Sequence, residues 1–255
     1  MQLDSQSWNE WIYSSVYTPE SQILNPKNKY GRELLALRIQ LLEKYLSGTA
    51  VDMGCGIGEF TRIASSFAKT VIGIDYSEQY IKQAREIINS NSGKIEYRLE
   101  SISQTSIAFN SVSSLFSYST LYYIPDIEKT IRHFREILIP GGVAILDFGN
   151  SSSLMDMFYR QAQENSTAQN FNIPTERIRS ILKNLDFEVL EWRSFQLLPM
   201  QGLSRRFIYL WPLTTQWWQN VMQCKVKGKL LDEIVSSSFL RNFAYRHLVV
   251  VRRND

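Results

Sequence analysis

The stretch VDMGCGIGEF at residues 51–60 constrains this chain more than any other. Its glycines occupy alternate positions, Gly54, Gly56 and Gly58. A β-type run precedes them and a helical pattern follows. Glycine adopts backbone conformations that other residues avoid, so the chain can turn tightly and approach a ligand closely. The following helix would direct its first N–H groups at that ligand. With Asp52 adding a carboxylate two positions before the first glycine, we predict a ligand site at this turn.

Strand and helix patterns alternate around the turn. We expect strands at residues 49–53, 70–76, 95–100, 111–119, 143–148, 187–195 and 247–253. We expect helices at residues 31–46, 59–67, 77–89, 126–138 and 175–185, the fourth of them ended by Pro140-Gly141-Gly142. Such alternation is typical of an α/β fold with a doubly wound, mostly parallel sheet.

The length of 255 residues and a hydrophobic share of 44% fit one large domain with an appended cap. We expect residues 1–46 to form an N-terminal helical lid. The ligand-binding domain would comprise residues 47–196 and 245–255. Residues 197–244, rich in aromatic side chains, would form a helical cap inserted before the last strand.

Composition narrows the class of protein. The two cysteines, Cys55 and Cys224, lie far apart and show no metal-ligand spacing. The first residues lack the basic and apolar regions of a signal peptide, and no apolar run reaches the ~18 residues that span a bilayer. We therefore expect a reduced, cytoplasmic protein without a metal.

Charge is uneven along the chain. The net charge is +3, which is too small to indicate nucleic acid by itself. Basic residues nevertheless outnumber acidic ones after Trp192. Two interpretations stay open: a solvated face of the cap, or attraction of an anionic substrate or surface.

A dinucleotide is one class of ligand that fits a glycine turn after the first strand. A dinucleotide site has the pattern G-x-G-x-x-G, whereas here the third glycine comes one residue early. Asp75 ends the second strand near the ~20-residue offset of an acid that accepts hydrogen bonds from a ribose hydroxyl pair. A nucleoside ligand is therefore expected.

The chain resembles the class I S-adenosylmethionine-dependent methyltransferases. DMGCGIG is similar to that family's acidic-x-Gly-x-Gly-x-Gly motif, and GIDYS at 73–77 is similar to its second-strand acidic motif. Further similar segments are FSYSTLYYIPD at 116–126, EILIPGGVAILD at 136–147, FNIPTERIRSILKNLDFEVLEW at 171–192 and FAYRHLVVVRR at 243–253. The resemblance covers residues 30–195 and the last strand. It implies a Rossmann-like sheet of seven strands with the last strand antiparallel.

The resemblance also implies roles for individual residues toward S-adenosylmethionine. The residues it places at the cofactor are Asp52, Gly54, Cys55, Gly56, Gly58, Asp75, Tyr76, Glu100, Ser101, Ile102, Ser117 and Tyr118. Gly54 to Gly56 would pass over the methionyl and ribose parts. Asp52 would organise the turn or meet the methionyl ammonium through water, and Asp75 would accept both ribose hydroxyls. Tyr76 would pack on the adenine, while Ser117 and Tyr118 would flank the methyl donor.

The chain departs from the family pattern at two places. The position that usually holds an acid for the adenine amino group is Ser101, where Glu100 could substitute if the register slips by one residue. The acid that often precedes the fourth strand is replaced by Ser113.

Methyl transfer from a sulfonium needs mainly that the acceptor be positioned, with a general base where the acceptor is a hydroxyl. We expect Tyr122, Tyr123 and Asp147 at the acceptor, each with packing or capping as the alternative role. The lid and cap would add Tyr13, Tyr17, Trp211 and Trp217. His133 and His247 are expected to be structural.

The predicted function is methyl transfer from S-adenosylmethionine to an oxygen or nitrogen of a small molecule, by a monomer or homodimer. One alternative is a non-catalytic cofactor-binding subunit, suggested by Ser101 and Ser113. Another is RNA methylation through the basic cap, and contact of the cap with a membrane surface also stays open. A nicotinamide dehydrogenase fits the glycine spacing least well.

Overall fold

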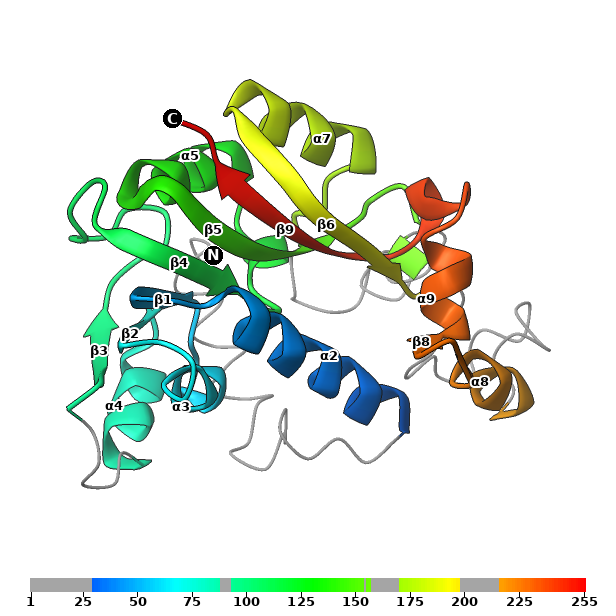
Figure 1. The fold of residues 1–255 in the computed structure, drawn as a ribbon, viewed down its shortest axis with the longest axis horizontal. Helices are drawn as coiled ribbons and strands as arrows, with labels where there is room; N and C mark the ends of the chain where they lie inside the picture. Colours follow the sequence, from blue (N-terminus) through cyan, green and yellow to red (C-terminus); the bar gives the residue numbers. More distant parts are fainter. Residues whose placement is uncertain (1–28, 88–92, 154, 157–169, 198–215) are drawn as a thin grey trace, which may run out of the picture.

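The computed structural model describes residues 29–87, 93–153, 155–156, 170–197 and 216–255. In this part of the chain the main sheet has seven strands in the order β3-β2-β1-β4-β5-β9-β6 (Figure 1). The strands are β1 (Thr49–Met53), β2 (Thr70–Asp75), β3 (Ile95–Leu99), β4 (Val112–Ser117), β5 (Leu138–Gly149), β6 (Phe187–Phe195) and β9 (Arg246–Arg253). Strands β1 to β5 run parallel to one another, and β9 runs antiparallel between β5 and β6. The predicted α/β fold with a reversed last strand is confirmed.

Helices connect the strands. They are α2 (Lys29–Tyr45), α3 (Glu59–Ala64), α4 (Glu78–Ile87), α5 (Ile127–Ile137) and α7 (Thr175–Asn184). Two begin at side-chain caps: the Asp126 carboxylate accepts from Lys129 N at 3.1 Å, and the Ser77 hydroxyl accepts from Tyr80 N at 3.4 Å. Such caps satisfy N–H groups that have no partner within the helix.

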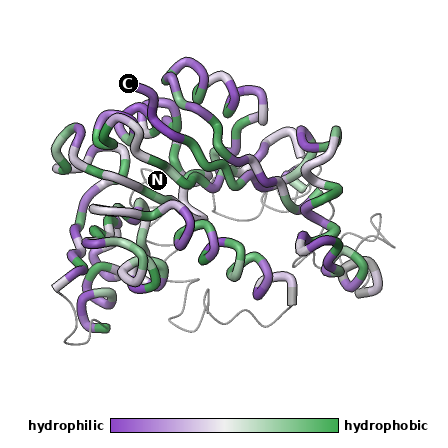
Figure 2. Tube along the Cα trace, in the orientation of Figure 1, coloured by the Kyte–Doolittle hydropathy of each residue, from purple (hydrophilic) through white to green (hydrophobic). Residues whose placement is uncertain are grey.

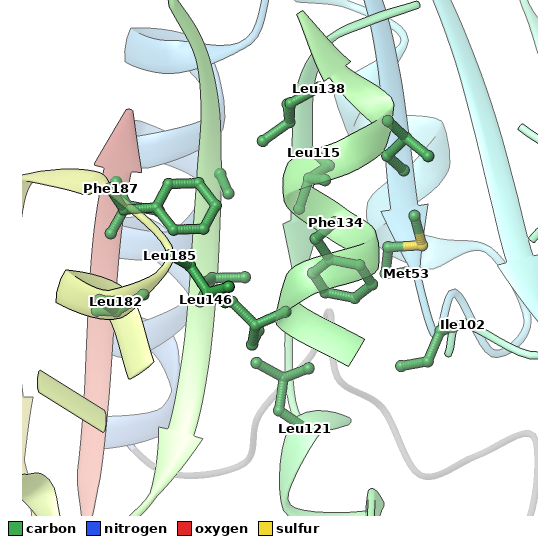
Figure 3. Packing of buried hydrophobic residues seen from close by; sticks show 14 of the residues in the cluster. Met53, Ile102, Leu115, Leu121, Phe134, Leu138, Leu146, Leu182, Leu185 and Phe187 are labelled. Carbon is green, nitrogen blue, oxygen red and sulfur yellow. The ribbon is translucent and has the colours of Figure 1, made fainter. Parts of the chain in front are cut away.

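The core lies on both faces of the sheet, because successive strand residues point to opposite sides. Ala50, Phe116, Ile145 and Val250 face α2 and α3. Their strand neighbours face α5 and α7, among them Val51, Leu115, Leu146 and Val251. Figure 3 shows Phe134 of α5 with Leu115, Leu146 and Met53 in this second cluster. In Figure 2 hydrophobic and hydrophilic stretches alternate along α2, as expected for a helix with one buried side.

Some predicted boundaries were wrong. The segment Pro140-Gly141-Gly142 lies within β5 rather than between the helix and the strand. β4 pairs Val112 with Leu138 and then Ser114 with Val143, so the extra β5 residues bulge out of the register. Gly141 has φ +75°, which glycine adopts without steric cost. The predicted helix at 59–67 also ends early, at Ala64.

The segment before the last strand is less helical than predicted. Its described part contains α8 (Gln216–Met222), β7 (Lys225–Val226), β8 (Lys229–Leu230), α9 (Leu231–Ser236) and the 3-10 turn η3 (Arg241–Phe243). The strands β7 and β8 form a hairpin through Lys227 and Gly228, which both have positive φ. The division into lid, domain and cap stays a prediction, since residues 1–28 and 198–215 lie outside the described residues.

Two features are absent from the described residues. No helix there has the length and apolar character needed to cross a bilayer. The same residues contain no group of three or more His, Cys, Asp or Glu side chains that could hold a metal ion.

Candidate active site

The glycine turn follows β1 at the carboxyl edge of the sheet. The N–H groups of Gly54 and Cys55 both donate to the carbonyl oxygen of Ile74, at 2.8 and 2.9 Å. These bonds attach the turn to the end of β2. The φ angles of Gly54, Gly56 and Gly58 are +85°, +53° and +76°, in the left-handed region that favours glycine.

The three glycines face different surroundings. A Cβ atom at Gly54 would lie 2.4 Å from the hydroxyl of Thr120, and one at Gly58 would lie 1.9 Å from the phenol oxygen of Tyr97. A Cβ at Gly56 would meet no atom of the described residues within 4 Å. Gly54 and Gly58 are therefore needed for packing, whereas the backbone at Gly56 faces open space that a ligand can fill.

Asp75 ends β2 beside this open face and is buried. Its Oδ2 accepts from Gly56 N and its Oδ1 from Ser77 N, both at 2.9 Å. Burial raises the pKa of the carboxyl, and the backbone hydrogen bonds oppose that rise. A carboxylate offers about four acceptor positions, so the backbone N–H groups of Gly56, Ser77 and Tyr76 leave room for a further donor.

Asp52 lies beneath the turn and is also buried. Its Oδ2 accepts from the hydroxyl of Thr61 on α3 at 2.7 Å. Burial raises the pKa of Asp52 to about 7; the Thr61 hydrogen bond opposes the rise and the charge of Asp75 adds to it. Of the two predicted roles, this geometry supports organisation of the turn.

The end of β4 connects the turn to α2. The hydroxyl of Ser117 donates to Met53 O at 2.8 Å, and the hydroxyl of Tyr118 donates to Arg38 O at 3.0 Å. Thr120 then donates to the carbonyl oxygens of Tyr118 and Gly54, at 3.1 and 3.3 Å. Ser117 and Tyr118 thus fix the positions of the strand end and the helix.

A cluster of charges lies on the other side of β4. Asp147, fully buried at the end of β5, accepts from Arg38 of α2 at 2.8 Å and from Arg246 of β9 at 2.6 Å. The Ser119 hydroxyl lies 3.1 Å from a terminal nitrogen of each arginine, and Ser119 N donates to Asp147 at 3.2 Å. We call Arg38, Ser119, Asp147 and Arg246 the arginine cluster.

Comparison with known proteins agrees with this arrangement. Residues 51–146 match a family model described as a methyltransferase domain. Phosphoethanolamine N-methyltransferase 1 of Triticum aestivum is 31% identical over 140 residues, which are 53% of this chain and 28% of that protein. Methyltransferase GfsG of Streptomyces halstedii is 23% identical over 145 residues, 55% of this chain and 52% of that protein. The chain therefore spans about half the length of these relatives or less.

Solved structures share the fold over nearly the whole chain. N-methyltransferase NodS of Bradyrhizobium japonicum, solved with S-adenosyl-L-homocysteine, has a TM-score of 0.61 at 18% identity and covers 99% of this chain and 100% of its own. Magnesium protoporphyrin IX methyltransferase of Synechocystis has a TM-score of 0.60 at 13% identity and covers 98% of this chain and 100% of its own. Residues 51–146 are thus similar to a methyltransferase domain. At these identities the solved structures show that the chain shares the fold of these methyltransferases, and the fold alone.

The glycine turn fits S-adenosylmethionine, the cofactor that the matched methyltransferase domain implies. Gly56 leaves space for a ligand against the backbone, and Asp75 keeps an acceptor position for a ribose hydroxyl. Cys55 is buried with its thiol 3.5 Å from Gly56 O, and burial raises its pKa, so it is a packing residue of the turn. Tyr76 follows directly after Asp75 and is half-buried.

The residues after β3 have partners within the protein. The Glu100 carboxylate accepts from the backbone N and the hydroxyl of Ser106, at 2.7 and 2.6 Å. Ser101 is exposed and forms a bridge with Gln104, while Ile102 is buried in the core (Figure 3). The Glu100 carboxylate thus binds Ser106. Contacts of these residues with adenine stay a prediction.

The candidate acceptor residues differ in what they can do. Both oxygens of Asp147 accept from Arg246, so Asp147 holds guanidinium groups, and its contact with the acceptor stays a prediction. Tyr122 and Tyr123 lie in the 3-10 turn η1 (Leu121–Tyr123), half-buried, with ring centroids 4.5 Å apart. The Arg246 guanidinium lies 5.6 Å from the Tyr122 ring centroid.

The predicted lid and cap residues are mostly not placed. Tyr13, Tyr17 and Trp211 lie outside the described residues. Trp217 lies on α8 with 65% of its surface exposed, which argues against a role in lining an apolar pocket.

Both histidines are structural, as predicted. His247 is buried between the hydroxyls of Thr175 and Ser194, each at 2.9 Å. Burial lowers its pKa to about 3, with the charges of Arg241 and Arg179 adding to the shift. His133 accepts from Thr105 N at 3.0 Å.

Four residues of the site were not predicted from the sequence: Arg38, Arg246, Ser119 and Thr61. The position of Arg38 in the sequence indicated a special role, because it lies on the apolar stripe of α2 between Leu34 and Leu41. An arginine there is unexpected on a helix that packs against the sheet, and it indicates a buried partner.

Proposed function

We propose that this protein transfers a methyl group from S-adenosylmethionine to an oxygen or nitrogen of a small molecule. The observation that carries the proposal is the open backbone face at Gly56 beside the buried Asp75 carboxylate. The match of residues 51–146 to a methyltransferase domain supports it. The names of the relatives and neighbours, which include phosphoethanolamine and magnesium protoporphyrin methyltransferases, favour a small-molecule acceptor.

The chain's residues would bind and orient the reactants. When bound, the cofactor supplies an activated methyl group on sulfur, so transfer is a displacement in line with the attacking atom. Asp75 would accept from a ribose hydroxyl and the turn at Gly54 and Gly56 would lie along the nucleoside. Tyr122 and Tyr123 would contact the acceptor. With a hydroxyl acceptor, the phenol oxygen of one of them would take up the acceptor's proton while its own phenol proton passes to water.

Calorimetry with S-adenosylhomocysteine tests the cofactor site. We expect the unmodified protein to bind, and Asp75→Ala to weaken binding by more than about tenfold, because hydrogen bonds to a charged group contribute roughly 1.5–3 kcal/mol each. Glu86→Ala is the matched control, since Glu86 is an exposed carboxylate on α4. Absence of binding by the unmodified protein would refute the proposal.

An assay of methyl transfer distinguishes the proposed enzyme from the alternative, a non-catalytic cofactor-binding subunit. Formation of S-adenosylhomocysteine by the protein alone with any small acceptor excludes the subunit. The cytoplasmic location and the monomer or homodimer state stay predictions from the sequence.

A further inference from the structure

The arginine cluster contains more positive than negative charge. Two guanidinium groups share the one carboxylate of Asp147. Arg38 has 7% of its surface exposed and Asp147 has none, so the ion pair is inside the protein. A buried charge is costly unless it is paired, and one carboxylate can neutralise only one of the two guanidiniums.

Two other acidic residues, Asp232 and Glu233, bind partners outside the arginine cluster. Asp232 of α9 accepts from the Tyr30 hydroxyl at 2.8 Å and from Gln196 N at 2.9 Å. Glu233 pairs with Arg193 at 2.7 Å. Within the described residues, Asp147 is thus the acid that pairs with Arg38 and Arg246.

The cluster also keeps donor capacity. The Nε of Arg38 is buried and has no hydrogen-bond partner in the part of the chain that the structure describes. A guanidinium has five donor hydrogens in a fork that matches a carboxylate or phosphate. Arg246 retains 16% exposure of its side chain, so the cluster reaches solvent there, beside the ring of Tyr122.

The cluster adjoins the cofactor turn through consecutive residues of the chain. Ser119 contacts both arginines, and Thr120 packs against Gly54 and donates to its carbonyl oxygen. Arg38 also lies 5.2 Å from the Tyr118 ring centroid. A group bound at the cluster would therefore lie next to the molecule held at the turn.

We propose that the methyl acceptor carries an anionic group, a carboxylate or a phosphate, that binds to Arg38 and Arg246. This inference rests on the proposed function, whose acceptor class it narrows. The bound anion balances the second guanidinium, and Tyr122 forms one wall of the site. Arg246 is the specificity-determining residue, since it is the more exposed arginine.

Calorimetric titration of the whole protein saturated with S-adenosylhomocysteine tests the proposal, with inorganic phosphate and acetate as probes at constant ionic strength. We expect one or both anions to bind, and Arg246→Gln to weaken that binding by tenfold or more. The preferred probe indicates which headgroup the acceptor carries. Arg252→Gln is the control, because Arg252 is an exposed β9 arginine paired with Glu188.

The inference is overturned if the unmodified protein binds no anion, if Arg246→Gln binds anions equally well, or if the control loses binding equally. Affinity for S-adenosylhomocysteine is measured in parallel. If Arg246→Gln weakens it as much as anion binding, the cluster serves the cofactor's own carboxylate and the inference fails. Normal cofactor binding without anion binding refutes only this inference, whereas absence of both also refutes the proposed function.

Arg246→Gln should fold, because it leaves Arg38 and Asp147 as a balanced pair. If it does not, Arg246→Lys provides the test. Lysine keeps the charge but loses the planar fork, so anion binding should weaken while the fold persists. Unchanged binding by Arg246→Lys would then contradict the proposal.

Discussion

The carboxyl edge of the sheet has two ends with opposite charge. On one side of β4 lie the buried carboxyls of Asp52 and Asp75, with the glycine turn between them. On the other side lie Arg38 and Arg246, held by Asp147. The acidic side presents acceptors for hydroxyl groups and suits a cationic sulfonium, and the basic side presents donors that suit an anion. The edge is thus divided into two sites of complementary charge.

The two sides also differ in how the chain builds them. The acidic side comes from residues 52–75, and Asp75 bonds to Gly56 across 19 positions. The basic side joins residues 81 to 127 positions apart, as in the contacts of Ser119 with Arg38 and Arg246. A local segment can be recognised as a motif, whereas a site assembled from distant segments leaves no local pattern.

The largest expected effect follows from removing the shared carboxylate. Asp147→Asn leaves two guanidiniums buried without an ionic partner, and we expect the free energy of unfolding to fall by about 3–5 kcal/mol. Urea unfolding measures it. Adding Arg246→Gln should recover part of the loss because it removes the excess charge. If Asp147→Asn is as stable as the unmodified protein, the cluster is not a buried ion pair.

On the acidic side of β4, by contrast, we expect removal of a carboxylate charge to raise the free energy of unfolding. The pKa of Asp52 is about 7 in the folded protein against an ordinary value of 3.8. The folded state therefore binds the proton more tightly than the unfolded state, and the stability from this group is present below about pH 4 and lost as pH rises to about 7. Asp52→Asn removes the charge while keeping an acceptor for Thr61.

Asp52→Asn should therefore gain stability relative to the unmodified protein as pH rises from 4 to 8, by up to roughly 4 kcal/mol. Urea unfolding at several pH values measures the difference. Glu86→Gln, at an exposed site, should show no such trend. A difference that stays constant with pH would mean that Asp52 is not the source.

The smallest expected changes in stability come from two glycine variants of the turn. Together they distinguish a glycine needed for packing from one needed for ligand binding. Gly54→Ala places a Cβ 2.4 Å from the Thr120 hydroxyl at φ +85°, and should cost about 2–3 kcal/mol of stability. Gly56→Ala meets no neighbour and should cost about 1–2 kcal/mol, from its left-handed backbone alone.

For affinity toward S-adenosylhomocysteine we expect the reverse order of the two variants. Gly56→Ala should reduce affinity for S-adenosylhomocysteine strongly, since its methyl group enters the open face. Thermal melts and calorimetry on both variants provide the test, with Gly54→Ala/Thr120→Ala expected to recover stability. Unaltered cofactor affinity in Gly56→Ala would show that the ligand lies elsewhere.

Sequence patterns predicted the elements that depend on local interactions. The helix after Asp126 was predictable from its cap, and the strand Phe187–Phe195 from its β-type side chains. The bulge at Pro140-Gly141-Gly142 was not, because a proline followed by glycines reads as a turn when the pairing with β4 is unknown. Asp147 was predicted at the edge of the sheet, but its arginine partners were not, since they lie 109 and 99 positions away.

By itself the sequence determined the class of fold, the glycine turn and the acid at the end of β2. These features depend on side-chain periodicity, on the conformational freedom of glycine and on short separations along the chain. Tertiary structure alone decided that Gly56 faces open space and that Arg38 and Arg246 converge on Asp147. Parallel strands bring their carboxyl ends to one edge whatever their order in the chain, and the antiparallel β9 adds its first residue to that same edge. The charge of the second site therefore emerges only when the sheet is assembled.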